Sequence, residues 1–199
     1  ATTEIYTLSL HDALPIFKPE WTDAFLHSME LDLTKKEYNS LEETLNYIYG
    51  SAEVIGLFMA RIMSLPEESH TAAAMLGRSM QYINFIRDIA EDLTLGRRYL
   101  PLTDSALSGL EEDVTRQNPA EFTNFINNQL KLYFSWQEKA EHGFTFIPRR
   151  YRIPIKTASD MYNWTGRVIR KDPFVVYQKQ VKPPKMRIIL QGVWNAFTC

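Results

Sequence analysis

Two aspartates spaced four residues apart are the clearest candidates for chemistry in this sequence. Asp88 and Asp92 lie in the segment NFIRDIAEDLTLGRRYLP, which is otherwise rich in apolar residues. Side chains at positions i and i+4 share one face of an α-helix, so the two carboxylates are expected to project side by side. Adjacent carboxylates repel each other, and one tends to keep its proton unless a cation compensates. Oxygen-only ligands favour Mg²⁺, with Mn²⁺ as an alternative, and Mg²⁺ commonly bridges carboxylates to substrate phosphates.

Two neutral polar side chains extend this face of the predicted helix. At about 100° per residue, Gln81 and Asn84 fall within roughly 80° of the two aspartates. The opposite side is apolar and consists of Ile83, Ile86, Ile89, Ala90 and Leu93. A helix that is apolar over most of its circumference is normally buried, and buried acids need partners. The spacing alone leaves two readings equally open, a metal–phosphate site and a solvated, salt-bridged helix face.

Arg87 and Glu91 flank the polar stripe and are themselves four residues apart. Arg87 could contact a phosphate or form an ion pair with Glu91, and we favour the ion pair. The four histidines (His11, His27, His70 and His142) show no metal-ligand spacing.

Composition limits the class of protein. The 199 residues suit one globular domain, 45% are hydrophobic, and the net charge of −2 gives no argument for nucleic-acid binding. The single cysteine, Cys199, excludes a disulfide framework and indicates a reducing compartment. No apolar run approaches the ~18 residues that cross a bilayer. We therefore expect a cytoplasmic protein, at most peripheral on a membrane.

Helical periodicity dominates after residue 20 and predicts an all-α fold. Ser40 is a predicted N-cap with Glu43 three residues on, and Gly96 is a predicted helix end. A break is expected at IPRRYRIP (147–154), and no alternating strand pattern is present. The predicted helices cover residues 20–33, 40–63, 69–96, 119–144, 155–171 and 181–197.

Residues 81–101, QYINFIRDIAEDLTLGRRYLP, resemble the second aspartate-rich motif of the squalene/phytoene synthase family. Residues 35–57 are similar to the family's preceding pocket helix, and residues 151–190 to its C-terminal region. The resemblance spans roughly residues 20–190. It implies an isoprenoid-synthase-like helical bundle around a central cavity, with Mg²⁺-dependent head-to-head joining of two prenyl diphosphates.

Details of the motif indicate a branch of the family. The ending GRRYLP and the Ile89–Ala90 pair resemble phytoene synthases, which implies conversion of geranylgeranyl diphosphate to phytoene in carotenoid biosynthesis. Squalene or dehydrosqualene synthesis is the alternative within the enzyme class, and squalene formation would require NADPH. A non-catalytic scaffold relative is a further alternative, which the intact Asp88 and Asp92 disfavour.

The resemblance also implies roles for individual residues. Asp88 and Asp92 would be catalytic and hold metal, with Gln81, Asn84 and Arg87 beside the substrate. Lys179 falls where relatives commonly place a phosphate-binding arginine. The residues that match pocket-lining positions are Tyr49, Ala52, Val54, Gly56 and Tyr162. Peripheral membrane contact would suit the lipid product, and no obligate protein partner is inferred.

Residues 1–17 show no sustained helical stripe and resemble a translated sequencing-adapter read. We therefore expect a non-family segment at 1–17 and the C-terminal two-thirds of a synthase domain at 18–199. Family members carry a first aspartate-rich motif on an earlier helix, and no DxxxD precedes Asp88 here. Asp32 is expected to be an ordinary helix residue. The resemblance thus predicts a bundle that is incomplete at its N-terminus.

Overall fold

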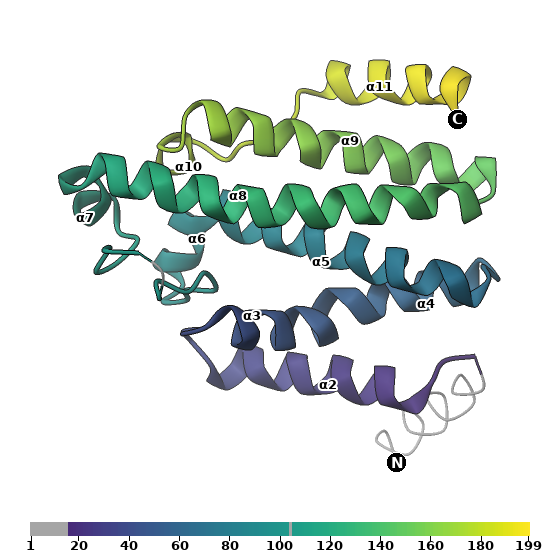
Figure 1. The fold of residues 1–199 in the computed structure, drawn as a ribbon, viewed down its shortest axis with the longest axis horizontal. Helices are drawn as coiled ribbons and strands as arrows, with labels where there is room; N and C mark the ends of the chain where they lie inside the picture. The colour runs from purple at the N-terminus through teal and green to yellow at the C-terminus, as the bar shows by residue number, and fades with distance from the viewer. Residues whose placement is uncertain (1–15, 104) are drawn as a thin grey trace, which may run out of the picture.

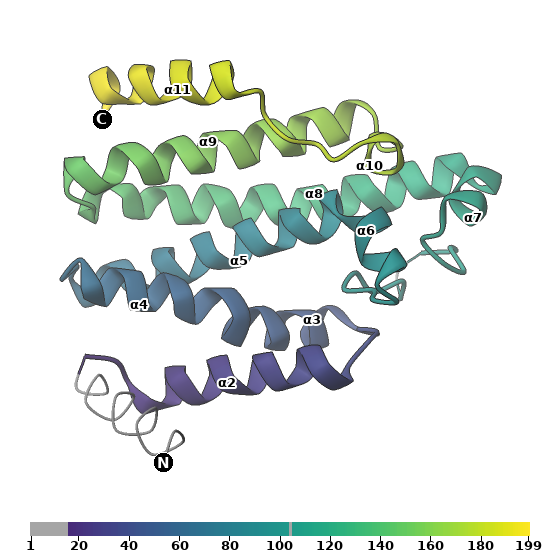
Figure 2. The ribbon, with the colours of Figure 1, turned by 180° about the vertical axis from the view of Figure 1, so that it is seen from behind.

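The computed structural model describes residues 16–103 and 105–199, and it is all-α as the helical periodicity predicted. No strand forms within these ranges, where Glu37 and Arg98 make one isolated bridge. Figures 1 and 2 show the long helices side by side, from α2 at one edge of the molecule to α11 at the other. The helices are α2 (Pro19–Thr34), α3 (Leu41–Ile48), α4 (Val54–Ile62), α5 (His70–Arg87), α6 (Ile89–Thr94), α7 (Glu112–Gln117), α8 (Pro119–Glu141), α9 (Arg149–Lys171), α10 (Val175–Gln178) and α11 (Lys185–Thr198).

Helix α5 lies at the centre of the fold and carries Gln81 and Asn84 of the polar stripe, whereas Asp88 follows its last residue and Asp92 lies on α6. It packs against α8 on one side and against α4 on the other (Figure 1). Ile83 and Ile86 are fully buried, as their position opposite the stripe predicted. Tyr82 and Phe85 are buried as well, so most of the circumference of α5 lies in the core. The core therefore fixes the direction in which the remaining polar face points.

Local sequence signals determine several helix ends. The Ser40 hydroxyl accepts the N–H of Glu43 (3.1 Å), which confirms the predicted N-cap of α3. Gly96 has φ +66°, a left-handed conformation that glycine adopts freely and that commonly terminates a helix. The backbone N–H of Arg97 then closes the end of α6 by donating to the Asp92 carbonyl (2.8 Å).

Two of the predicted helices are interrupted. A five-residue π-helix (Tyr49–Glu53) separates α3 from α4. Glu53 is buried there and pairs with Arg78 of α5, whose Nε lies 2.7 Å from Glu53 Oε1. The second interruption falls at Asp88 (φ −100°, ψ 17°), between α5 and α6.

The prediction of a break up to Pro154 is wrong, because α9 begins at Arg149 and Pro154 lies inside it. Pro154 is the sixth residue of α9 and lies beyond its first turn, so the helix continues although one i→i−4 hydrogen bond is missing there. None of the described helices has the length and apolar character needed to cross a membrane.

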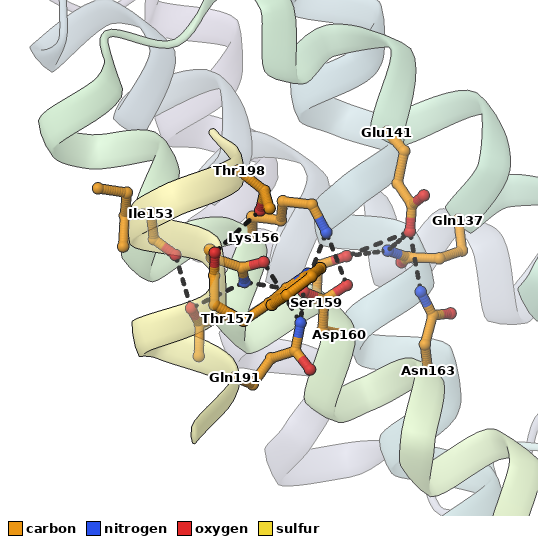
Figure 3. A network of polar contacts seen from close by, with 12 residues as sticks. Gln137, Glu141, Ile153, Lys156, Thr157, Ser159, Asp160, Asn163, Gln191 and Thr198 are labelled. Carbon is orange, nitrogen blue, oxygen red and sulfur yellow. Dashed lines mark hydrogen bonds and ion pairs between the residues drawn. The ribbon is translucent and has the colours of Figure 1, made fainter. Parts of the chain in front are cut away.

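Helix α11 is held on α9 by a polar network (Figure 3). Asp160 is its centre and pairs with Lys156 Nζ (2.9 Å) on its own helix. From α11, the side-chain amides of Gln191 and Asn195 donate to the same carboxylate at 2.9 and 2.8 Å. The outward side of α11 is apolar and exposed, including Trp194 at 64% and Phe197 at 82%.

Candidate functional site

The two aspartates remain on one side of the chain despite the break at Asp88. The N–H of Asp88 donates to the carbonyl of Asn84, and the N–H of Asp92 donates to the carbonyl of Asp88, both at 2.8 Å. This i→i+4 pattern keeps the helical register across the interruption. Gln81, Asn84, Asp88 and Asp92 are all half-buried, as expected for a polar stripe on a core helix.

Arg87 pairs with Asp88 and not with Glu91, so the predicted Arg87–Glu91 pair is wrong. Arg87 Nε donates to Asp88 Oδ1 at 2.7 Å, and the guanidinium Nη2 of Arg87 donates to Asp88 Oδ2, which makes the contact bidentate. Both side chains are only 18% exposed. The distortion at Asp88 brings the two neighbouring side chains together, a contact that a regular helix does not offer to adjacent residues. Glu91 is exposed and instead accepts from the Gln180 side chain (3.4 Å).

Asp92 shows the charge conflict expected from the spacing. Burial, and then the charges of Asp88 and Glu91, raise the pKa of Asp92 to about 7, while Arg97 and Arg87 act in the opposite direction. A carboxyl group in this state gains from any cation that approaches it. A cation bound beside Asp92 would therefore compete with this proton.

Arg97 is a residue of this site that the sequence analysis did not assign. Its guanidinium donates to the backbone carbonyl of Asp32 (3.1 Å) and to the Tyr99 hydroxyl (3.4 Å). Asp32, which the sequence analysis expected to be an ordinary helix residue, in turn accepts a hydrogen bond from the Tyr47 hydroxyl at 2.7 Å. The position of Arg97 directly after the helix-ending Gly96 was the available signal, because such a residue folds back along the helix end.

The described residues fit a divalent cation that a substrate phosphate helps to hold. No three His, Cys, Asp or Glu side chains converge on a metal position in the described part of the chain. Two carboxylates with a phosphate partner are nevertheless a usual Mg²⁺ arrangement. The Oδ1 atom of Asn84, one turn before Asp88, is buried and has no hydrogen-bond partner among the residues that the structure describes. An unpaired buried oxygen beside a carboxylate is the kind of group that a cation or a hydrated cation satisfies.

An apolar cavity of about 430 Å³ adjoins the polar stripe between α4, α5 and α9. Gln81 and Asn84 provide polar groups at its stripe end, and most of the remaining lining is aliphatic. Ala52, Gly56 and Tyr162, which the resemblance matched to pocket positions, are among the residues that line it. A second cavity of about 660 Å³ lies between α9 and α11 and shares Tyr162 with the first.

The structure places the other two predicted pocket residues differently. Val54 is fully buried and packs with Trp21 and Leu57, away from the cavity. Tyr49 is 39% exposed and is not among the residues that line it. The π-helix that contains Tyr49 changes which side chains face α5, and a constant helical period does not predict that shift.

Lys179 lies on the rim of a small cavity beside the aspartate stripe. The cavity has a volume of about 170 Å³, and Lys179 lines it together with Arg87, Asp88 and Glu91. Lys179 is exposed and follows α10 directly. The fold thus brings a cation that is distant in sequence close to the aspartate-rich motif.

Comparisons with known proteins agree with this geometry. The family model described as squalene/phytoene synthase matches residues 7–187. The chain belongs to the squalene/phytoene synthase family. This confirms the resemblance carried by residues 81–101. The match begins at residue 7, whereas the sequence analysis expected family-like sequence from residue 18, and residues 1–15 lie outside the described part of the chain.

Curated relatives in the squalene/phytoene synthase family are named as phytoene synthases. Phytoene synthase 1 of Zea mays is 32% identical over 146 residues, covering 69% of this chain and 36% of its own length. The 15-cis-phytoene synthase of Enterobacter agglomerans is 30% identical over 200 residues, covering 94% of this chain and 64% of its own length. This chain therefore spans between about one third and two thirds of these relatives.

Solved structures of the family share the fold. A squalene synthase from Alicyclobacillus acidocaldarius superposes with a TM-score of 0.70 at 20% identity, covering 78% of this chain and 60% of that one. A dehydrosqualene synthase solved with a ligand gives 0.71, also at 20% identity, covering 88% and 63%. These likenesses confirm the isoprenoid-synthase-like helical fold.

Proposed function

We propose that this chain provides the substrate cavity and the second aspartate-rich motif of an enzyme that joins two prenyl diphosphates head to head. The proposed substrate is geranylgeranyl diphosphate and the proposed product is phytoene, because the relatives with 30% identity or more are phytoene synthases. The observation that carries the proposal is the cavity beside α5. It is polar at Gln81 and Asn84, next to the aspartates, and apolar beyond them, as an amphipathic prenyl diphosphate requires.

Each residue has a distinct task in this proposal. Asp88 and Asp92 would hold Mg²⁺, and Asn84, one turn before Asp88, would complete the polar stripe. When bound, Mg²⁺ supplies Lewis-acid stabilisation of the departing diphosphate. Lys179 would add a positive charge on the diphosphate, as a point charge without bidentate geometry. The half-buried Tyr162 ring would face the developing allylic cation.

The walls of the cavity contribute by excluding water. Most of the side chains that line it away from the stripe are aliphatic or sulfur-containing, including Ile55, Met59, Leu76 and Met80. Such walls accommodate the prenyl tail and keep water from reacting with a carbocation. They also strengthen the charge interactions at the polar end, because the local dielectric constant is low.

The proposal predicts that Asp88→Asn and Asp92→Asn each abolish Mg²⁺-dependent binding and turnover. Calorimetry would measure binding of geranylgeranyl thiodiphosphate with and without Mg²⁺, and a coupled assay would measure diphosphate release. Glu91→Gln is the matched control, since Glu91 is an exposed acid of the same helix outside the stripe. Near-parental Mg²⁺ dependence in either aspartate variant would exclude the metal assignment. Product analysis with and without NADPH separates phytoene formation from squalene formation.

A further inference from the structure

Helix α11 directs its apolar side outward and its polar side towards the protein. The exposed apolar side chains recur every three or four residues and are Met186, Ile189, Leu190, Val193, Trp194 and Phe197. On the opposite side, Gln191 and Asn195 donate to Asp160 of α9. A surface helix of a globular protein normally has the reverse orientation. Figures 1 and 2 show α11 at the edge of the molecule, so its apolar side has no partner among the described helices.

Basic residues lie at both ends of this apolar side. At the N-terminal end of α11 the exposed cations are Lys182, Lys185 and Arg187. At the C-terminal end, Arg149 Nε donates to the Cys199 carbonyl (3.0 Å), and the neighbouring Arg150 is exposed. None of these basic side chains forms an ion pair with an acid in the described part of the chain. Their charges are therefore available to a partner.

The charge of this region differs from that of the chain as a whole. Residues 147–199 contain eleven basic and two acidic residues, whereas the whole chain has a net charge of −2. No charged residue follows Arg187 along α11. The region thus combines an uncharged apolar strip with a basic rim. Amphipathic helices with this combination bind bilayers that contain anionic lipids.

A second copy of the chain matches this side of α11 less well. Two copies that pack their apolar sides together would bring basic ends close to basic ends, whether the helices run parallel or antiparallel, and like charges at an interface oppose association. The 14 residues of α11 extend over about 21 Å, less than the ~30 Å hydrocarbon core of a bilayer. A helix of this length lies in the plane of the membrane surface.

We propose that the outward side of α11 docks on the surface of a bilayer that contains anionic lipids. Leu190, Trp194 and Phe197 enter the boundary between headgroups and acyl chains, a depth at which tryptophan is common. The basic residues at both ends contact lipid phosphates. Docking also brings the 660 Å³ cavity, which Ile188 and Gly192 line from α11, next to the lipid. Membrane docking does not depend on the reaction proposed above, so vesicle binding tests it separately.

The test measures binding of the 199-residue chain to phosphatidylcholine vesicles with and without phosphatidylglycerol, by flotation. Affinity should be at least about tenfold higher with phosphatidylglycerol, because each basic residue near an anionic surface contributes about fivefold. The tryptophan fluorescence should shift to shorter wavelength on binding. Trp194 would cause this shift, since Trp21 and Trp136 are already buried.

Phe197→Ser tests the apolar contact. It should lower the affinity for phosphatidylglycerol vesicles at least about tenfold, because a large apolar side chain no longer enters the lipid. Leu33→Ser in α2 is the matched control, since Leu33 is 80% exposed and Phe197 is 82% exposed. The control should bind as the parent does.

A paired variant, Lys182→Gln with Lys185→Gln, tests the electrostatic contact. Its affinity for phosphatidylglycerol vesicles should also fall at least about tenfold, while its weak binding to phosphatidylcholine alone stays at the parental level. Lys131→Gln with Lys139→Gln in α8 is the control, because it changes the net charge equally at exposed positions on another helix.

The outcomes decide which surface covers α11. If the parent binds neither kind of vesicle, or if Phe197→Ser and the Lys182/Lys185 variant bind as the parent does, α11 is not a membrane-docking helix. A parent that is dimeric by sedimentation equilibrium and monomeric as Phe197→Ser would show that a second copy covers this side, which also overturns the proposal. Should Phe197→Ser not fold, as judged by circular dichroism, the lysine variant decides.

Discussion

Asp92 is a half-buried acid held next to two other acids, and its carboxyl group has a pKa of about 7 in place of 3.8. At pH values between 3.8 and about 7, the Asp92 carboxyl group keeps a proton in the native state that it has lost in the unfolded state. Native stability contributed by this proton is therefore present at low pH and declines as the pH rises towards 7. A pKa difference of about three between the native and unfolded states limits the pH-dependent change in the free energy of unfolding to about 4 kcal/mol. Because Asp92 is only half-buried, solvent screening reduces the expected change to about 1–2 kcal/mol.

We therefore predict that the parent chain without Mg²⁺ loses more stability between pH 5 and pH 8 than Asp92→Asn does. Urea unfolding of both proteins at a series of pH values would measure the difference. Added Mg²⁺ at pH 8 should stabilise the parent and leave Asp92→Asn almost unchanged, since a ligand stabilises only the state that binds it. If the free energy of unfolding depends on pH in the same way in both proteins, the pKa of Asp92 is not raised in the native state.

The polar stripe itself could be predicted from residue spacing, because i,i+4 geometry is local and survives a distorted turn. The partner of Arg87 could not, since the backbone at Asp88 departs from helical values and redirects the side chain. Arg97 was also missed, as its contact with the Asp32 carbonyl joins residues 65 positions apart. Contacts between residues that are distant in the sequence could not be predicted, because they depend on how the helices pack.

At the scale of elements, the close approach of α5 to the π-helix depends on glycine. A Cβ on Gly77 would lie 2.2 Å from the carbonyl oxygen of Ala52 and 3.1 Å from the Cα of Glu53. Backbone atoms cannot yield as a flexible side chain can, so α5 and the π-helix (Tyr49–Glu53) would have to separate. The same separation would open the cavity that Ala52 and Gly77 line.

Gly77→Ala should consequently destabilise the protein by about 1–3 kcal/mol, the usual cost of overpacking. This loss would appear although alanine is the better helix former by about 1 kcal/mol. Gly192→Ala in α11 is the matched control, because its added methyl group would lie 3.9 Å from the nearest atoms. Denaturant unfolding should show Gly192→Ala to be neutral or stabilising. A Gly77→Ala protein as stable as the parent would indicate that the two elements are not in close contact.

The sequence predicted the cores of the long helices well and their interruptions poorly. Amphipathic periodicity extends over many residues, so α2, α5, α8 and α11 were recognisable. The π-helix at Tyr49–Glu53 coincides with the pairing of buried Glu53 with Arg78, a contact between residues that are far apart in the sequence. Local rules predicted a break at Pro154, yet α9 continues through this residue. Neither departure from a regular helical pattern follows from local preference alone.

At the scale of the whole molecule, α11 is the element least integrated into the core. It packs mainly on α9 (Figure 2), and its outward residues, such as Trp194 and Phe197, are exposed. It nevertheless forms one wall of the 660 Å³ cavity through Ile188 and Gly192, opposite Tyr162. The two cavities meet at Tyr162, and the attachment of α11 determines whether the larger one keeps this wall.

That attachment depends on Asn195, which is fully buried and donates to Thr157 Oγ1 (3.1 Å) and to Asp160 Oδ2 (2.8 Å). Asn195→Ala removes two hydrogen bonds at a fully buried position, one of them to a carboxylate, a loss of about 1–3 kcal/mol. Lys156 and Gln191 still donate to Asp160 Oδ2 in this variant. We expect amide hydrogen exchange in α11 to accelerate at least about tenfold, while exchange in α5 and α8 stays at the parental rate, because the opening is local. Thr198→Ala is the control, since its hydroxyl bonds only to the Trp194 carbonyl within α11. Equal acceleration in α5 and α8 would show instead that α11 unfolds together with the core, and that the wall of the larger cavity is as stable as the molecule itself.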